Sequence, residues 1–203
     1  MKNKKILILG IGAIILICVI VFVIFNYKNL KNGNTMINKS EEEIKDYILN
    51  ISSYEALVKI EVQTNKNKNN YVVKQSLKDN VSKQEVIEPE NIAGVVTFYD
   101  GNNLSISNNK LELTTTYENY QYMVENSLWL DSFIREYKEL QNYKMEVNEN
   151  EIILNLKNEN GNKYNVYKQL YIDKKTAKPT KMIIQDINKN TLVYILYTEI
   201  EIS

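Results

Sequence analysis

The sequence predicts an α+β protein in which short helices cover one face of an antiparallel β-sheet, behind a single N-terminal transmembrane helix. Three observations support this fold class. The chain begins with an uncharged apolar run, Ile6 to Phe25. Beyond residue 40, most segments alternate apolar and polar residues with the period of two that marks a strand with one buried face. The segments between them are short enough for hairpins, which favours antiparallel pairing.

The apolar run Ile6–Phe25 is expected to span a membrane as a helix. At about 1.5 Å per residue, a helix of this length covers about 30 Å, the thickness of the hydrocarbon layer. Lys2, Lys4 and Lys5 precede the run and favour a cytoplasmic N-terminus with the remainder outside, as a single-pass protein of the cell membrane. The expected organisation is a cytoplasmic N-terminus and transmembrane helix (1–27), a polar tether (28–39) and an extracytoplasmic β domain (40–203).

Two other interpretations of the apolar run compete with an uncleaved helix. A cleaved signal peptide usually has a shorter apolar region and a small-residue cleavage site, and no A-x-A pattern follows Phe25. A lipoprotein signal would place a lipid on Cys18, the only cysteine, but the bulky Ile17 precedes it and the apolar run continues beyond it. The uncleaved helix is therefore favoured, with Cys18 as a small apolar residue in lipid.

The outer domain is expected to begin with a helix and continue with strands. Ser40 and Glu43 form a capping-box pattern at the start of a helix over residues 40–51. Alternation then predicts about five strands, and Asp100-Gly101 between two of them is a strong hairpin signal. The expected strand ranges are 54–62, 71–78, 81–87, 95–99 and 104–107, with 110–113 continuing the meander.

A helical region interrupts the predicted sheet between residues 120 and 140. Apolar residues at helical spacing indicate two short helices, which would cover the apolar face of the sheet together with the first helix. Strands then return, with a further hairpin signal at Asn160-Gly161. The expected ranges are 144–147, 151–156, 164–172, 181–186 and 191–202, and in the last strand Leu192, Tyr194, Leu196, Ile200 and Ile202 are expected to share one face.

The composition excludes several classes of function. The chain has no histidine and one cysteine, so Ser-His and Cys-His catalysis, a disulfide within the domain and metal sites made of Cys and His ligands are all excluded. After Lys2, Lys4 and Lys5, 22 basic residues remain against 25 acidic ones, which does not favour a nucleic-acid partner. The carboxylates are scattered, and Glu41 to Glu43 fit the start of a helix. No catalytic, cofactor-binding or metal-binding residue is therefore predicted.

Aromatic and apolar side chains on the sheet and in the helical region are the remaining candidates for a site. One interpretation is ordinary packing of helix on sheet. The other is an apolar groove between the sheet and its helical cover, suited to an acyl chain or to the side chains of a partner. The candidate groove and partner-binding residues are Phe98, Tyr99, Leu128, Trp129, Phe133 and Tyr137.

Two segments resemble a known family. Residues 170–182 (LYIDKKTAKPTKM) are similar to the strand–loop–strand of the lipoprotein-carrier, or LolA-like, superfamily, in which an ID-x-x-T-x-x-P stretch precedes the last strands. Residues 98–104 (FYDGNNL) look like the central hairpin of the same superfamily. Within it, residues 40–203 most resemble the clostridial germination lipoproteins, the GerS-like proteins.

The resemblance implies an incomplete, half-open antiparallel barrel with helices over an apolar cavity. Carriers of this fold hold lipoprotein acyl chains, whereas the germination lipoproteins are non-enzymatic partners of a peptidoglycan amidase in spore cortex processing. The expected function is therefore a membrane-anchored envelope protein that binds a cell-wall enzyme or another envelope protein, with lipid or acyl-chain binding as the alternative. The sequence departs from carriers, which use a strand arginine, since its only arginine, Arg135, falls in a predicted helix. It departs from germination lipoproteins because Cys18 fits lipidation poorly.

Overall fold

The computed structural model describes residues 39–64, 66–108, 110–120, 128–140, 143–158 and 163–203. The apolar run Ile6–Phe25 and the tether as far as residue 38 lie outside these residues, so the transmembrane helix and the topology stay predictions. Among the described residues, no helix is both long enough and apolar enough to cross a membrane.

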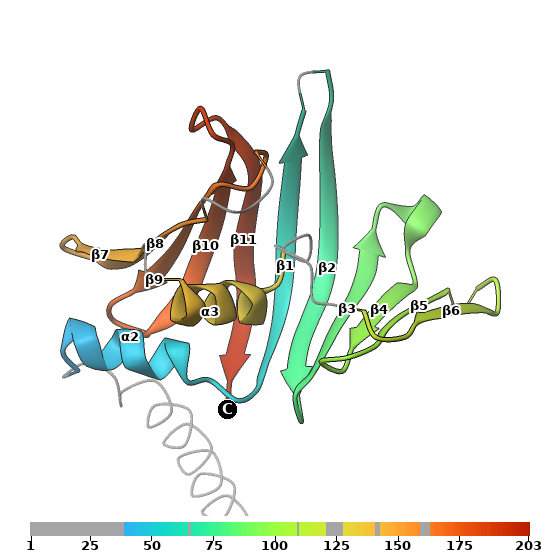
Figure 1. Cartoon of the computed structure of the whole chain (residues 1–203), viewed down its shortest axis with the longest axis horizontal. Coiled ribbons are helices and arrows are strands. Elements are labelled where there is room, and N and C mark those ends of the chain that lie inside the picture. The colour runs from blue at the N-terminus through green and yellow to red at the C-terminus, as the bar shows by residue number, and fades with distance from the viewer. Residues whose placement is uncertain (1–38, 65, 109, 121–127, 141–142, 159–162) are drawn as a thin grey trace, which may run out of the picture. The chain divides into compact units, whose positions relative to one another are not determined.

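The described residues form one antiparallel sheet with helices on one face, as the sequence predicts (Figure 1). The helices are α2 (Glu41–Leu49) and α3 (Leu130–Glu139), with a 3-10 turn η1 (Glu90–Ile92). The strands are β1 (Tyr54–Gln63), β2 (Lys68–Lys78), β3 (Val81–Glu88), β4 (Val95–Tyr99), β5 (Leu104–Asn108), β6 (Leu113–Tyr117), β7 (Tyr143–Val147), β8 (Glu151–Lys157), β9 (Tyr167–Asp173), β10 (Lys178–Gln185) and β11 (Thr191–Ile202).

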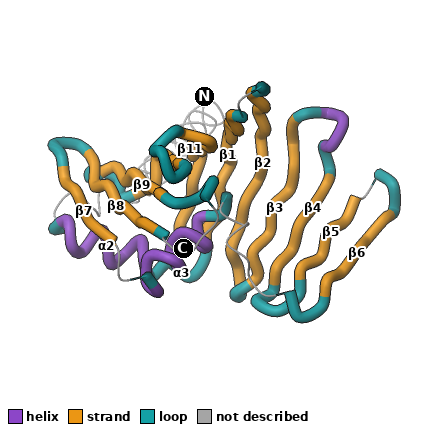
Figure 2. Tube along the Cα trace, turned by 45° about the horizontal axis from the view of Figure 1, so that its top comes forward, coloured by secondary structure: helices purple, strands orange, loops and turns teal. Residues whose placement is uncertain are grey.

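The sheet is open, with order β6-β5-β4-β3-β2-β1-β11-β10-β9-β8-β7. Its first and last strands, β1 and β11, pair in the middle, and each half then runs outward through consecutive hairpins. Figure 2 shows β6 and β7 at opposite ends of the sheet. The predicted antiparallel sheet is thus observed and is not closed into a barrel; in the described residues, six of its strands precede α3 and five follow it.

The first helix begins where the capping box predicts. The backbone N–H of Ser40 donates to the Glu43 carboxylate (2.7 Å), and the backbone N–H of Glu43 donates to the Ser40 hydroxyl (3.3 Å). These bonds satisfy amide groups that have no partner within the helix. Ile44 and Ile48 are buried, which places the apolar face of α2 against the rest of the domain.

The core lies on the face of the sheet that carries the helices, which we call the inner face. One row of paired residues crosses five strands there: Ile60, Ile195, Met182, Leu170 and Leu154. All five are at most 3% exposed. Each such side chain contributes about 1.5–3 kcal/mol by leaving water, so this row is a major source of stability.

The other half of the sheet is less covered in the described residues. Every residue of β6 is exposed. The predicted strand over 110–113 is instead a turn in which Glu112 has a φ of 53°, and β6 starts at Leu113. Conversely, β1 and β2 pair as far as Gln63 and Lys68, beyond the predicted ranges 54–62 and 71–78. The added residues are mostly polar, and they extend the hairpin into solvent (Figure 1).

The predicted face of the last strand is wrong in its first half. Leu196 is 37% exposed, whereas Ile195 and Tyr197 are buried. A register shift opposite Leu57 and Val58 leaves Thr198 unpaired, as in a β-bulge. The bulge reverses the alternation, so buried positions change from odd to even and Ile200 returns to the inner face.

Candidate functional site

The six predicted site residues do not form one groove. Tyr99, Trp129, Phe133 and Tyr137 are buried, at most 4% exposed. Leu128 is half-buried against Tyr99 and Trp129. Phe98 is 38% exposed and, as the neighbour of Tyr99 on β4, points to the opposite, outer face. There its ring lies 5.5 Å from the Lys83 ammonium group, so it does not line the predicted groove.

The buried aromatic residues form two separate contacts. At the start of α3, Trp129 packs with Tyr99 and Leu104. Near the other end of α3, the Phe133 and Tyr137 rings are stacked at 5.8 Å. The geometry is that of a helix packed on a sheet; whether any of these residues contacts a partner stays a prediction.

A polar network lies between α3 and the inner face, which sequence reasoning missed. Asp131, in the first turn of α3, is only 7% exposed. Its carboxylate accepts hydrogen bonds from the Tyr54 hydroxyl of β1 (3.3 Å) and the Ser82 hydroxyl of β3 (2.7 Å). Arg135 lies 3.6 Å from the same carboxylate. The start of α3 is therefore fixed to two strands of the β1–β6 half of the sheet, with the negative charge at the favourable end of the helix dipole.

Amide side chains continue the network toward β2. The Trp129 indole N–H donates to the Gln84 carbonyl oxygen at 2.8 Å, and the Gln75 amide donates to the same oxygen at 3.0 Å. Gln75 also donates to the backbone carbonyl of Leu128 at 3.0 Å and is fully buried. Buried polar groups of this kind are tolerated because they bond to one another.

A buried ion pair attaches the other end of α3 to β9. The Lys168 ammonium lies 2.5 Å from a carboxylate oxygen of Glu136, and the two side chains are 1% and 8% exposed. Burial lowers the pKa of Lys168, and the charge and hydrogen bond of Glu136 oppose that shift. Lys168 is in phase with Leu170 and Ile172, so strict alternation along the strand would have placed this lysine in the core.

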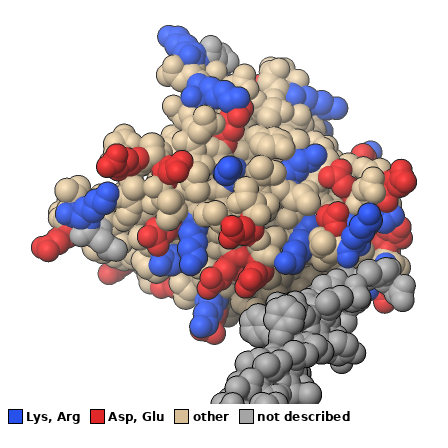
Figure 3. Space-filling model, turned by 180° about the vertical axis from the view of Figure 1, so that it is seen from behind, with Lys and Arg blue, Asp and Glu red and all other residues tan. Residues whose placement is uncertain are grey.

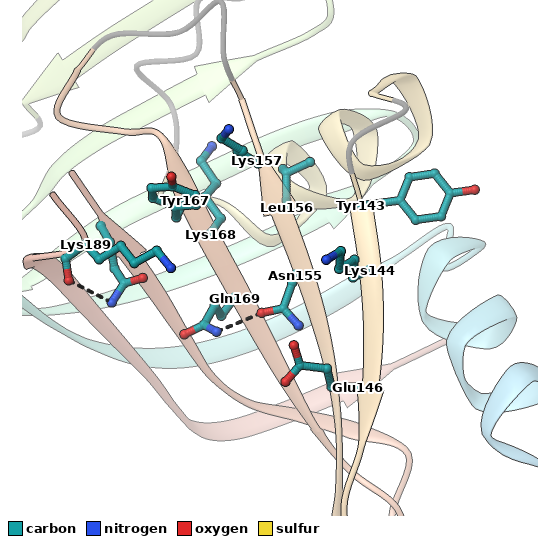
Figure 4. A pocket seen from close by; sticks show the side chains of 11 residues that line it. Tyr143, Lys144, Glu146, Asn155, Leu156, Lys157, Tyr167, Lys168, Gln169 and Lys189 are labelled. Atoms are coloured by element: carbon teal, nitrogen blue, oxygen red, sulfur yellow. Dashed lines mark hydrogen bonds between the residues drawn. The ribbon is translucent and has the colours of Figure 1, made fainter. Parts of the chain in front are cut away.

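Bonded polar groups therefore lie beneath both ends of α3, together with the buried apolar side chains of Leu130 and Phe133. Among the described residues, no group of three or more Cys, Asp or Glu side chains is arranged to hold a metal ion. An open cleft of about 700 Å³ lies instead over β7 to β10 (Figure 4). Most of its side chains belong to the outer face, the side of the sheet opposite α2 and α3.

An open antiparallel sheet with helices on one face defines a class of bacterial proteins with solved structures. One is an uncharacterized conserved protein from Thermus thermophilus, 12% identical over 81% of this chain and 88% of its own, with a TM-score of 0.54. Another is the GerS lipoprotein of Clostridioides difficile, solved in complex with the CwlD amidase, which is 26% identical over 81% of this chain and 96% of its own, with a TM-score of 0.53. A LolA superfamily protein from Nitrosomonas europaea is 12% identical over 81% of this chain and 94% of its own, with a TM-score of 0.43.

The sequence itself gives the family. The sequence model of the family of YdcC-like sporulation proteins matches residues 12–203, and this chain belongs to that family. The resemblance to the germination lipoproteins that the sequence indicates is thus confirmed. No curated protein sequence matches the chain.

Proposed function

We propose that this chain is a membrane-anchored, non-enzymatic envelope protein whose β domain binds a cell-wall enzyme, specifically a peptidoglycan amidase, during sporulation or germination. Two findings support the proposal. The family is one of sporulation proteins. The GerS lipoprotein, 26% identical to this chain, has been solved with an amidase bound. In this proposal Ile6–Phe25 is the anchor and the domain lies outside the cytoplasm.

The observation that favours partner binding over acyl-chain transport is the polar network on the inner face. An acyl chain needs an apolar cavity, and burying a charged group beside it costs several kcal/mol. The described inner face instead carries the Lys168–Glu136 pair, Asp131 and Gln75 beneath α3. The network makes α3 a fixed part of the scaffold, so recognition is assigned to the surface of the domain.

The surface of the outer face suits such recognition. Acidic and basic side chains are interspersed over it (Figure 3). Two exposed apolar side chains, Phe98 (38% exposed) and Leu196 (37% exposed), also lie on this face. Mixed surfaces of this kind are typical of non-obligate interfaces, in which charge fixes the choice of partner and aromatic and apolar groups supply affinity.

Affinity capture of the tagged full chain from sporulating cells, after membrane solubilisation, tests the proposal. We expect a cell-wall amidase to be recovered in a stoichiometric complex. The same preparation is analysed by mass spectrometry for bound lipid. Recovery of acyl lipid in stoichiometric amount without an envelope partner would contradict the proposal and support the carrier alternative.

The proposed topology has its own test. Protease added to intact protoplasts should digest residues 40–203, and the intact mass of the chain should show Cys18 without lipid. Protection of the domain would reverse the topology. A diacylated Cys18 would show that the apolar run is a lipoprotein signal.

A further inference from the structure

The outer cleft is lined by a cationic and amide-rich set of side chains that packing of the core does not explain. Its floor is formed by strands β7 to β10, and Lys189 from the β10–β11 turn lies at its rim (Figure 4). Its volume of about 700 Å³ is within the range of small-ligand sites, about 300–1,000 Å³. Of the described residues that line it, Glu146 is the one carboxylate, against several lysines.

Tyr167 organises the positive charge of the cleft. Its ring centroid lies 5.6 Å from the Lys189 ammonium and 6.0 Å from that of Lys157. The negative face of an aromatic ring attracts cations at this distance, so the ring holds two ammonium groups from different elements beside the cleft. Lys144 on β7 lines the same cleft and is exposed. The cleft therefore favours an anionic ligand.

Side-chain amides add recognition of neutral polar groups. The Gln169 amide donates to the Asn155 carbonyl oxygen at 2.7 Å, and Figure 4 shows the two amides facing each other across β9 and β8. Gln185 adds a third amide, which donates to the Lys189 backbone carbonyl at 3.2 Å. Each amide carries both donors and acceptors, which matches the hydroxyl and acetamido groups of sugars.

The backbone beneath the cleft argues against an extended peptide as the ligand. Strands β8, β9 and β10 are each paired on both sides, so their N–H and C=O groups are used within the sheet. A peptide that binds to a sheet usually adds to a free strand edge. Over β8 to β10, recognition therefore depends on side chains, and a peptide could add only at the outer edge of β7.

We propose that the outer cleft binds an oligosaccharide that carries carboxylate groups, with Lys144 and Lys189 contacting the carboxylates and Asn155 and Gln169 contacting hydroxyl or acetamido groups. This inference does not rest on the proposed amidase partner, because it follows from the side chains of β7 to β10. It adds a ligand site to a domain otherwise assigned to binding a protein.

Isothermal titration calorimetry on the full chain in detergent micelles tests the site. Three probes are compared: a tetrasaccharide of alternating N-acetylglucosamine and N-acetylmuramic acid, neutral chitotetraose, and hexaglutamate. We expect the muramic-acid probe to bind, with affinity that falls as salt rises, and the two others to bind at least tenfold more weakly. The double variant Lys144→Gln/Lys189→Gln should weaken binding of the muramic-acid probe about tenfold, as the loss of two partly exposed ionic contacts predicts.

The matched control is Lys66→Gln/Lys175→Gln, which removes the same charge from two exposed turns outside the cleft and should leave binding unchanged. Any of four results would overturn the proposal. The muramic-acid probe fails to bind, chitotetraose binds equally well, or hexaglutamate binds more strongly. The fourth is an equal loss of affinity in the two double variants. Capture of an amidase by the Lys144→Gln/Lys189→Gln variant is scored separately, so failure of the glycan site and failure of the partner role are distinguishable.

Discussion

Replacing Glu136 with glutamine should destabilise the domain strongly. The change leaves the Lys168 ammonium in a site where its side chain is 1% exposed, without the carboxylate that lies 2.5 Å away. Removing one partner of a buried ion pair costs about 3–5 kcal/mol, because the remaining charge is uncompensated. A domain of this size has a total stability of about 5–15 kcal/mol, so Glu136→Gln should remove a large part of it.

The double variant Glu136→Gln/Lys168→Met separates the pair from the packing around it. Methionine fills a similar volume and carries no charge, so no buried charge remains. Replacement of buried ion pairs by apolar residues is often neutral or stabilising by about 1–4 kcal/mol. Stability should therefore return to the wild-type value or exceed it.

Urea unfolding, followed by far-ultraviolet circular dichroism and by fluorescence of Trp129, the only tryptophan, measures these differences. The account of the inner face is refuted if Glu136→Gln is within about 1 kcal/mol of wild type. It is equally refuted if the double variant is no more stable than Glu136→Gln.

Further predictions concern the tyrosines, the aromatic residues and the helix cap. Burial raises the pKa of Tyr137 to about 12 and that of Tyr197 well above its ordinary value. Above about pH 10 the folded state keeps protons that the unfolded state loses, so the free energy of unfolding should fall with rising pH by about 1.4 kcal/mol per pH unit for each tyrosine. The Tyr197→Phe variant removes one of these tyrosines and should reduce the slope accordingly in urea titrations between pH 9 and 11. An unchanged slope would contradict the burial assigned to Tyr197. The Phe133→Ala variant should lose about 3–5 kcal/mol of unfolding free energy, whereas replacing the exposed Phe98 with alanine should lose less than about 0.5 kcal/mol. Similar urea midpoints for the two variants would refute the placement of these residues on opposite faces. Ser40→Ala should cost about 1 kcal/mol through loss of the cap, and no change in the unfolding midpoint would count against the capping box.

Local patterns predicted most of the elements. The capping box at Ser40 and the hairpin at Asp100-Gly101 were found because their signals are contained within a few residues. In the hairpin, the Asp100 carboxylate accepts the backbone N–H groups of Asn102 (2.8 Å) and Asn103 (2.6 Å), and Gly101 has a φ of 94°. Aspartate and glycine are favoured there for these reasons, so the residue types themselves indicate the turn.

The β11 bulge was beyond such local reasoning. Nothing in the stretch around Tyr197 and Thr198 marks an unpaired residue, and simple alternation assigned Leu196 to the core. The Thr198 hydroxyl donates to the Leu57 carbonyl oxygen at 2.9 Å, a contact between residues 141 positions apart. The position of the bulge depends on that pairing, which only the folded sheet contains.

The polar network was missed for the same physical reason. Glu136 and Lys168 are 32 positions apart, and Asp131 and Ser82 are 49 apart. Each residue alone resembles an exposed helix or strand residue. Their burial follows from where α3 docks on the sheet, and the sequence predicts the existence of that helix but not its placement. Recognition of the family came from residues 170–182 and 98–104, where the chain keeps a recognisable strand–loop–strand and hairpin.

The central claim, that the domain binds an amidase through its surface while its inner face stays closed, is tested most directly by one binding measurement. Purified full chain in detergent and its Glu136→Gln/Lys168→Met variant, which removes the buried charges beneath α3, are each titrated with a peptidoglycan amidase from the same organism. The account predicts a saturable one-to-one complex that has the same affinity for both chains. No complex with either chain, or an affinity that differs by about tenfold or more between them, would contradict it.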